Sequence, residues 1–349
     1  MHRVGTDRRM TSETTSRPPA DPAPDEIRGV AIVFPGQGTQ SLGMAGAILE
    51  VHPGARERFE RANDVLGYDL LKLVEEGPVE DLDDTVHSQP AIYVASMAWL
   101  DALQARWEEG GRPFEPLAMA GHSMGQVTAC VAAGALDYES GLQLVQERGR
   151  AMQAADRARP GGMASIIGLR DRVLNAIVGE ATHDDTLVVA NDNGPGHAVV
   201  SGDESALQRV MRLAEAQGAR RVVRLKISIA SHSPLMEEAQ DQFRQVVNTM
   251  TWRDPEVPVI SNASAGFLLT RDAIREELNS ALLQPVDWRN SVKAMAGQGV
   301  NLFVEAGPGD VLSKLVRRIS KRSWTFPVAD GETGLAQRDF PDLSDGIPK

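Results

Sequence analysis

The sequence has almost no cysteine, no long apolar run and no excess of basic residues, and each absence excludes a class of protein. The single cysteine, Cys130, excludes an internal disulfide and a cysteine-rich metal site. No apolar stretch approaches the roughly 18 residues that a membrane-spanning helix needs. The net charge of -12 argues against a nucleic-acid-binding protein, whose domain is normally basic. We therefore expect a soluble cytoplasmic protein that binds neither membrane nor nucleic acid and acts on small molecules or other proteins.

The two ends of the chain lack the aliphatic residues that a folded core requires. Residues 1–28 are rich in Pro, Thr and Ser, and residues 329–349 are acidic and interrupted by Gly and Pro. Neither segment can bury enough apolar surface to become ordered. We therefore expect two disordered tails and a folded part that spans residues 29–328.

Between these tails, short apolar runs alternate with segments whose apolar residues recur at helical spacing. The run 29–34 is typical of a buried strand because a Pro-Gly pair ends it abruptly. Pro90 is expected to start a helix over 91–103, since proline suits the first helical position. Further strands are predicted at 117–120, 257–261 and 301–305, and further helices at 125–136, 138–155, 234–249, 270–281 and 309–320. This alternation predicts an α/β domain, residues 29–158 and 228–328, with a mainly parallel sheet covered on both faces.

Residues 159–227 show a different order of elements. Strands are predicted at 163–168, 187–191, 198–201 and 221–227, and helices at 172–179 and 204–217. The order β-α-β-β-α-β is that of the split, ferredoxin-like unit. We therefore expect a small ferredoxin-like domain inserted into the larger α/β domain.

The sequence Gly121-His122-Ser123-Met124-Gly125 lies between a predicted strand and a predicted helix. In that context G-x-S-x-G forms a sharp turn that exposes the serine hydroxyl, because the glycines avoid side-chain clashes. The motif alone is also common as a plain glycine turn, but the flanking strand and helix favour a nucleophile. Ser123 is therefore the candidate nucleophile, and the N–H of Met124 at the helix N-terminus is suited to bind a developing oxyanion.

A serine nucleophile needs a base, and the chain has seven histidines to compare. The turn should direct the ring of His122 away from Ser123. Five more lie in a tail, in loops or at a helix end: His2, His52, His87, His183 and His197. His232 remains, at the point where the chain leaves the insert and re-enters the large domain. Its predicted role is general base toward Ser123 and then general acid toward a departing thiol.

An ordered series of short motifs resembles the malonyl-CoA:acyl-carrier-protein transacylase family, which includes the acyltransferases of polyketide synthases. The series covers essentially all of residues 29–328. Its members are 34–40 with 43–44, 88–91, 121–125, 148–153, 191–202, 231–233, 258–262, 285–288 and 305–309. The resemblance implies an α/β-hydrolase-like large domain with an inserted ferredoxin-like small domain, in agreement with the pattern of elements.

The resemblance also implies roles for single residues. The backbone N–H groups of Gln37 and Met124 would form the oxyanion hole. Arg148 would pair with the free carboxylate of a malonyl group, because a guanidinium can hold a carboxylate through two parallel hydrogen bonds. Taken alone, an arginine on an amphipathic helix is more often a surface charge. The other expected substrate-binding residues are Met152, Gln89 and Ser231.

Three positions bear on how closely the chain follows the family. Gln126 stands where the family usually has Glu, which removes a negative charge near the serine. Ala281 stands where relatives usually carry Gln or Asn, but the family orients its histidine through a main-chain carbonyl of the segment 279–288, so we expect little effect. Ser231 leaves more room than a Phe would, so a branched or larger acyl group remains an open alternative to malonyl.

The implied reaction moves an acyl group, most simply malonyl, from CoA to the serine and then to the phosphopantetheine thiol of an acyl carrier protein, with no metal or redox cofactor. Two alternatives stay open on the same scaffold. One is an editing hydrolase that strips acyl groups from carrier proteins, and the other is a transferase that moves a larger acyl group between carrier proteins.

Because carrier proteins are usually acidic, a local basic surface is expected on this acidic chain. Two clusters qualify, and both can equally be ordinary solvated charges. They are the C-terminal cluster of Lys314, Arg317, Arg318, Lys321 and Arg322 and the insert cluster of Arg220, Arg221, Arg224 and Lys226.

Overall fold

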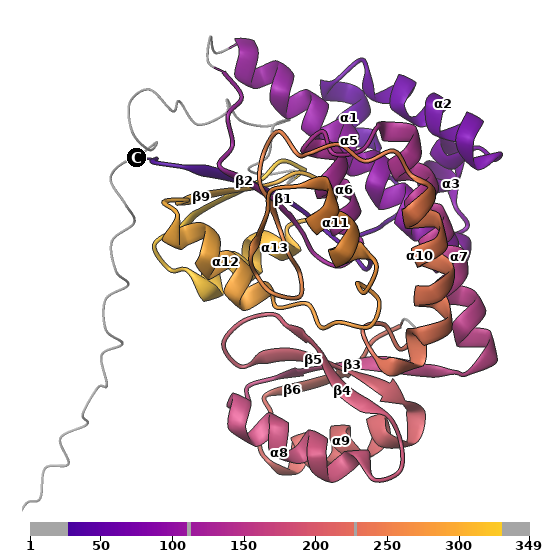
Figure 1. Cartoon of the computed structure of the whole chain (residues 1–349), viewed down its shortest axis with the longest axis vertical. Helices are drawn as coiled ribbons and strands as arrows, with labels where there is room; N and C mark the ends of the chain where they lie inside the picture. The colour runs from indigo at the N-terminus through magenta and orange to yellow at the C-terminus, as the bar shows by residue number, and fades with distance from the viewer. Residues whose placement is uncertain (1–26, 110–112, 227–228, 330–349) are drawn as a thin grey trace, which may run out of the picture.

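The computed structural model describes residues 27–109, 113–226 and 229–329, which form a large α/β domain and a smaller domain beside it (Figure 1). Most of the two expected tails, 1–26 and 330–349, lies outside the described residues. Residues 27 and 28 belong to the fold, because Ile27 packs against the core and the N–H of Arg28 donates to Asn301 Oδ1 at 2.8 Å. Within the described ranges, every helix is too short or too polar to cross a membrane.

Six strands form the sheet of the large domain, in the order β10-β9-β1-β2-β7-β8. All neighbours pair in parallel except β7 and β8, which are antiparallel. The strands are β1 (Val30–Phe34), β2 (Ala118–Gly121), β7 (Val259–Ile260), β8 (Phe267–Leu268), β9 (Leu302–Glu305) and β10 (Trp324–Pro327). Successive residues of β1 enter two separate hydrophobic cores, one on each face of the sheet, as the period of two in a strand requires.

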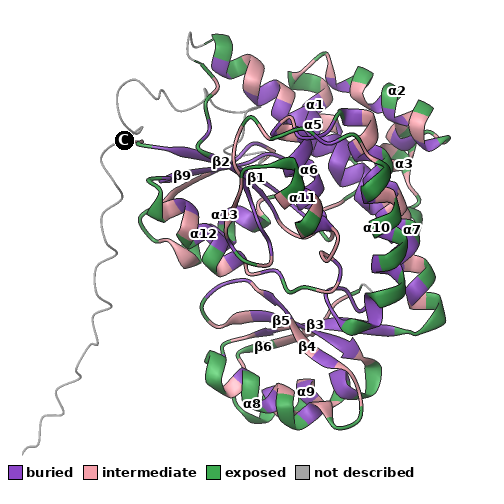
Figure 2. Cartoon of the chain, viewed as in Figure 1, coloured by how far each residue is buried: buried purple, intermediate pink, exposed green. Residues whose placement is uncertain are grey.

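Helices cover both faces of this sheet, and Figure 2 shows the buried residues gathered where helices and sheet meet. The larger core lies under α1 (Gly46–Val51), α2 (Ala55–Leu66), α3 (Leu70–Glu76), α4 (Val79–Asp83), α5 (Thr85–Glu109), α6 (Gly125–Ala132), α7 (Tyr138–Ala158), α10 (Glu237–Thr249) and α11 (Arg271–Leu278). The 3-10 turn η1 (Pro234–Met236) precedes α10. The second core lies under α12 (Trp288–Gly297) and α13 (Val311–Ile319).

The central helix α5 begins earlier than the sequence indicated. It starts at Thr85 and contains Pro90 in its interior, so the expectation that Pro90 starts the helix is wrong. Asp84 explains the earlier start: its Oδ1 accepts the N–H of Val86 at 3.0 Å, and its carbonyl accepts the next two N–H groups. The additional turn carries Thr85 and Gln89, which contact residues of the site described below.

The small domain is a four-stranded antiparallel sheet in the order β4-β5-β3-β6. Its elements are β3 (Gly161–Ile167), α8 (Asp171–Thr182), β4 (Leu187–Asp192), β5 (His197–Asp203), α9 (Glu204–Ala216) and β6 (Arg221–Arg224). Both helices pack on one face of the sheet, and the other face is turned toward the large domain (Figure 1). The predicted α/β fold with a ferredoxin-like insert is confirmed.

Contacts around Arg289 fix the small domain against the large one. A main-chain bridge joins Asn191 to Val286, and the N–H of Val286 donates to Ala190 at 2.8 Å. The guanidinium of Arg289, on α12, pairs with Asp171 and Asp192 of the small domain at 2.7 and 2.8 Å. The two domains are therefore joined by main-chain hydrogen bonds and by ion pairs as well as by the chain itself.

Candidate active site

The turn after β2 forces Ser123 into a conformation that presents its hydroxyl. Ser123 has φ +53°, in the left-handed region that few side chains adopt. A Cβ at Gly121 would lie 1.8 Å from the carbonyl group of Gly125, and one at Gly125 would lie 2.3 Å from Phe34 O. Both glycines of the motif are thus required, since a side chain at 121 would collide with the start of α6 and one at 125 with the end of β1.

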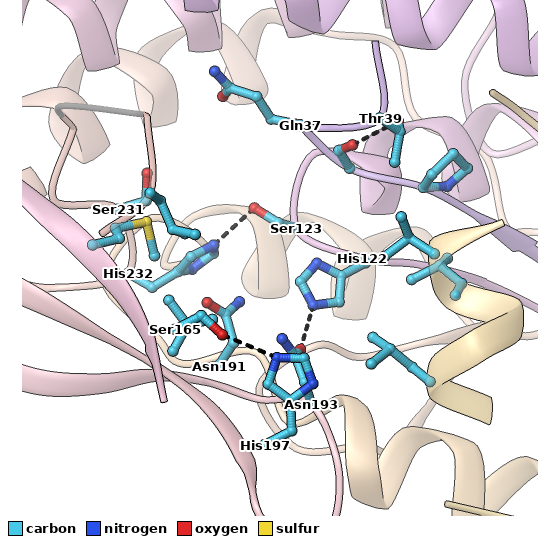
Figure 3. A pocket seen from close by; sticks show the side chains of 18 of the residues that line it. Gln37, Thr39, His122, Ser123, Ser165, Asn191, Asn193, His197, Ser231 and His232 are labelled. Atoms are coloured by element: carbon cyan, nitrogen blue, oxygen red, sulfur yellow. Dashed lines mark hydrogen bonds between the residues drawn. The ribbon is translucent and has the colours of Figure 1, made fainter. Parts of the chain in front are cut away.

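His232 lies against Ser123 although 109 residues separate them. Ser123 Oγ and His232 Nε2 are 2.7 Å apart (Figure 3). His232 Nδ1 is 2.8 Å from the carbonyl oxygen of Gln284. A carbonyl only accepts hydrogen bonds, so Nδ1 carries the proton and Nε2 is free to accept from the serine hydroxyl. The main-chain partner expected from the family is present, and Gln284, immediately before Pro285, provides it.

The surroundings of His232 keep its imidazole neutral. Burial, followed by the nearby positive charge of Arg148, lowers the pKa of His232 to about 3. The ring is therefore in its proton-accepting form throughout the physiological pH range, which is the form that a general base needs.

Two backbone N–H groups remain available beside Ser123. Within the part of the chain that the structure describes, no acceptor bonds the N–H of Gln37 or of Met124. The side chain of Gln37 points away from Ser123, where its Oε1 accepts from Thr85 Oγ1 at 3.1 Å (Figure 3). Gly36 allows the close approach of this loop, since a Cβ there would lie 2.5 Å from His122 O. The arrangement can hold an oxyanion between two N–H donors.

Arg148 is a buried cation at the nucleophile and not a surface charge. Only 3% of the residue is exposed. Its guanidinium donates to Ser123 Oγ at 3.1 Å, to Gln89 Oε1 at 2.9 Å and to Met152 Sδ at 3.2 Å. Burial lowers the pKa of Arg148 to about 10, and no carboxylate among the described residues pairs with it. A buried, uncompensated guanidinium is a site for an anionic ligand.

A cavity between the two domains opens onto these groups (Figure 3). Its large-domain wall includes Gln37, Ser123, Arg148, Met152, Ser231 and His232. Its small-domain wall includes Met163, Ser165, Asn191, Asn193, His197, Val199 and Leu225, and α13 adds Val311, Leu312 and Leu315. Gln89 does not line the cavity as a substrate-binding residue should; it lies behind the wall and contacts Arg148.

Comparisons with known proteins agree with this geometry. The acyl transferase domain family matches residues 31–343. The malonyl CoA-acyl carrier protein transacylase of Escherichia coli O157:H7 is 40% identical over 290 residues, which are 83% of this chain and 92% of that protein. The Bacillus subtilis (strain 168) enzyme of the same name is 37% identical over 87% of this chain and 94% of its own length. The chain belongs to the malonyl CoA-acyl carrier protein transacylase family.

Solved structures of family members show the same fold. The crystal structure of malonyl-CoA:acyl carrier protein transacylase from Xanthomonas oryzae pv. oryzae has a TM-score of 0.82 and 40% identity, over 88% of this chain and 96% of that one. The malonyl-transacylase PlMCAT, solved in complex with the type II polyketide synthase acyl-carrier protein AntF, has a TM-score of 0.82 and 37% identity, over 86% and 96%. The resemblance to this transacylase family is confirmed.

Two histidines that sequence reasoning set aside also line the cavity. His122 Nε2 is 2.9 Å from Asn193 Oδ1, so its ring is turned away from Ser123 as expected and reaches the small domain. His197 Nε2 lies 3.2 Å from Ser165 Oγ, and burial lowers the pKa of His197 to about 4. Neither ring contacts Ser123. Their place in the wall depends on the packing of two domains, which no local sequence signal reveals.

Asn262 is the contact of the nucleophile that sequence reasoning missed. Its Oδ1 accepts the N–H of Ser123 at 2.8 Å, and its amide group also contacts Gln126. The motif 258–262 belongs to the resemblance, and Asn262 directly follows the predicted strand 257–261, which is the signal that the sequence offers. That this strand lies next to β2 is seen only in the structure.

Each of the two basic clusters contains one cation that pairs with a carboxylate. On α13, which contributes residues to the cavity wall, Arg318 is exposed and its charge helps to lower the pKa of His197, whereas Lys314 pairs with Asp310 at 2.7 Å. In the insert cluster, Arg224 pairs with Glu204 at 2.8 Å. Each cluster thus has an exposed cation near the cavity: Arg318, whose charge acts on the wall residue His197, and Lys226, which follows the wall residue Leu225.

Proposed function

We propose that the chain transfers a malonyl group from malonyl-CoA to the phosphopantetheine thiol of an acyl carrier protein through an ester on Ser123. One observation carries the proposal: the hydroxyl that contacts the neutral His232 also contacts the buried guanidinium of Arg148. A nucleophile next to an anion site suits an acyl group that has its own carboxylate. The names of the relatives and the solved complex with a carrier protein support the substrate and the partner.

In the first half of the cycle, His232 Nε2 takes the proton of Ser123 while Oγ attacks the thioester carbonyl. The N–H groups of Gln37 and Met124 hold the oxyanion of the tetrahedral intermediate. The intermediate then collapses, the carbon–sulfur bond breaks, and His232 returns the proton to the CoA thiolate. A malonyl ester remains on the serine.

The second half repeats these steps with the carrier-protein thiol as nucleophile. That thiol gives its proton to His232, its sulfur attacks the ester, and the serine leaves with the proton from the imidazolium. The two thiols use the same site in turn, which predicts ping-pong kinetics. Removing one donor of an oxyanion hole typically reduces the rate by about 100- to 1000-fold, so both N–H groups are needed in both halves.

Arg148 has one task in this cycle, which is to hold the malonyl carboxylate beside Ser123. Met152 and Ser231 line the space for the acyl group beside it. An editing hydrolase acting on plain acyl chains would gain nothing from a buried cation at this point.

The proposed chemistry needs no metal or redox cofactor, because acid–base transfer and oxyanion binding by these residues suffice for each step. We also place the protein in the cytoplasm, since malonyl-CoA is a large, highly charged molecule that does not cross a membrane unaided. Both statements follow from the substrate proposed.

The test is incubation with malonyl-CoA labelled in the malonyl group, with and without an acyl carrier protein. We expect label on Ser123 of the wild type, none on a Ser123→Ala variant, and rapid passage of the label to the carrier thiol. Release of the label as free malonate, at a rate that the carrier protein does not change, would show a hydrolase and refute the proposal.

A further inference from the structure

Two buried side-chain amides, Asn262 and Gln126, lie directly behind the nucleophile. Asn262 Oδ1 accepts the N–H of Ser123 at 2.8 Å, and Asn262 Nδ2 donates to Gly121 O at 2.7 Å and to Gln126 Oε1. Gln126 Nε2 donates to Ile260 O at 2.9 Å. Together the two amides hold the backbone on both sides of His122 in the turn that carries Ser123.

The direction in which each amide faces decides whether this network holds. A reversed Asn262 would set its NH₂ group against the N–H of Ser123 and its oxygen against the carbonyl of Gly121, so both contacts would become repulsive. Gln126 prevents the reversal, because Ile260 O requires its NH₂ group and leaves only its oxygen to face Asn262. Each amide thus fixes the other.

The main chain of Asn262 is held independently by a carboxylate of α11. Glu277 Oε1 accepts the N–H of Asn262 at 2.7 Å, and Glu277 Oε2 accepts the hydroxyl of Ser261 at 2.6 Å. Hydrogen bonds therefore hold the loop after β7 on its far side, while Asn262 contacts the N–H of Ser123, whose φ is positive, on the other.

We propose that Gln126 and Asn262 are positioning residues for Ser123, and that a neutral amide at position 126 makes this positioning independent of pH. The inference rests on the proposed role of Ser123 as nucleophile. A glutamine offers one donor and one acceptor, which match Ile260 O and Asn262 Nδ2. An ionised glutamate, the usual residue of the family at this position, only accepts, and would leave the carbonyl of Ile260 facing a negative charge.

The experiment compares Gln126→Glu with the uncharged, similarly shaped Gln126→Met. The single-turnover rate of Ser123 acylation is measured against pH and divided by the wild-type rate. A buried carboxyl has a raised pKa, so at low pH the protonated carboxyl of the Gln126→Glu variant can both donate and accept as the glutamine does.

We expect Gln126→Glu to acylate at close to the wild-type rate at the low end of the pH range. As the pH rises and the carboxyl ionises, its relative rate should fall by about 10- to 100-fold, the usual effect of an unmatched buried polar group. Gln126→Met should be slow by a constant factor at every pH. KM for malonyl-CoA should change little in either variant, since Arg148 is untouched.

A relative rate for Gln126→Glu that stays flat with pH overturns the proposal. Circular dichroism across the pH range checks that the variants remain folded. Should Gln126→Glu unfold, the Met variant decides, because a folded Met variant that acylates within about twofold of the wild type also overturns it. Every rate is measured with malonyl-CoA and with a fluorophosphonate, which labels any activated serine. If malonyl-CoA fails on the wild type while the fluorophosphonate reacts, only the proposed substrate is wrong.

Discussion

Replacement of Arg148 by methionine should shift the acyl selectivity from malonyl towards acetyl and change the stability of the fold little. The guanidinium is buried, and no carboxylate among the described residues balances it. A malonyl carboxylate would accept two charge-assisted hydrogen bonds from it, each contributing about 1.5–3 kcal/mol. Loss of both corresponds to about 3–6 kcal/mol, or roughly a 10²- to 10⁴-fold fall in kcat/KM for malonyl-CoA.

The same substitution should change the stability of the fold little. Burial lowers the pKa of Arg148 from its usual 12.5 to about 10, which means that the unfolded chain binds this proton more tightly than the folded one. Below pH 10 the folded state therefore carries a penalty of about 3 kcal/mol for the charge. Methionine removes this penalty but also the hydrogen bonds to Gln89 Oε1 and Ser123 Oγ, worth about 1–3 kcal/mol each, so the two effects are of similar size. The melting temperature should therefore change little.

The assay measures transfer of malonyl and of acetyl groups from CoA to a carrier protein, together with a thermal melt. We expect malonyl transfer to collapse and acetyl transfer to persist or improve, because acetyl has no carboxylate and needs no cation. Equal losses for the two acyl groups would refute the carboxylate-clamp role. A large fall in melting temperature would refute the argument that the charge destabilises the fold.

Three further outcomes follow from the described contacts. His232 must be neutral to act, and its pKa is lowered to about 3. The rate at which a fluorophosphonate labels Ser123 should therefore decline with falling pH only well below 6.5, the usual pKa of histidine. A decline centred near pH 6.5 in folded protein would contradict this. The Arg318→Glu variant should raise KM for the carrier protein several-fold, more at low salt than at high salt, because Arg318 lies on α13, which lines the cavity. Arg220→Glu, which changes a charge outside the cavity wall, should raise KM less. Equal effects would contradict a carrier-protein docking surface on α13. Burial raises the pKa of the Cys130 thiol, so a thiol reagent should modify it only on unfolding, and rapid modification of the native protein would show that the core at α6 opens.

The parts of the site that the sequence predicts are those in which one segment determines its own shape. The run 29–34 is apolar at every position because β1 faces a core on each side, and this makes it visible as a strand. The turn at Ser123 requires glycine at two fixed positions, so its motif can be recognised without the rest of the chain. Such features can be recognised in the sequence whatever the arrangement of the neighbouring elements.

Arg148 shows what a single segment cannot reveal. On a helix that is otherwise amphipathic, its charge indicates a solvated face. The adjacent Gly149 explains why Arg148 is buried instead. A Cβ at Gly149 would lie 2.7 Å from Thr85 O, so the missing side chain lets α7 approach α5 and bury Arg148. The start of α5 at Thr85, set by Asp84, is part of the same contact. Burial of the cation is therefore a property of two helices together, and only the resemblance to the family suggested it.

The main-chain partner of His232 is explained by the charge of its surroundings. A carboxylate at Nδ1 would raise the pKa of the imidazole and would compete with a malonyl carboxylate for the guanidinium of Arg148. The carbonyl of Gln284 orients the ring and fixes its tautomer without adding a charge. Since this contact uses no side chain, Ala281→Gln, which restores a residue usual in the family, should change kcat by less than about twofold. A change of tenfold or more in transfer assays would mean that a side chain in this segment, and not its backbone, holds the base.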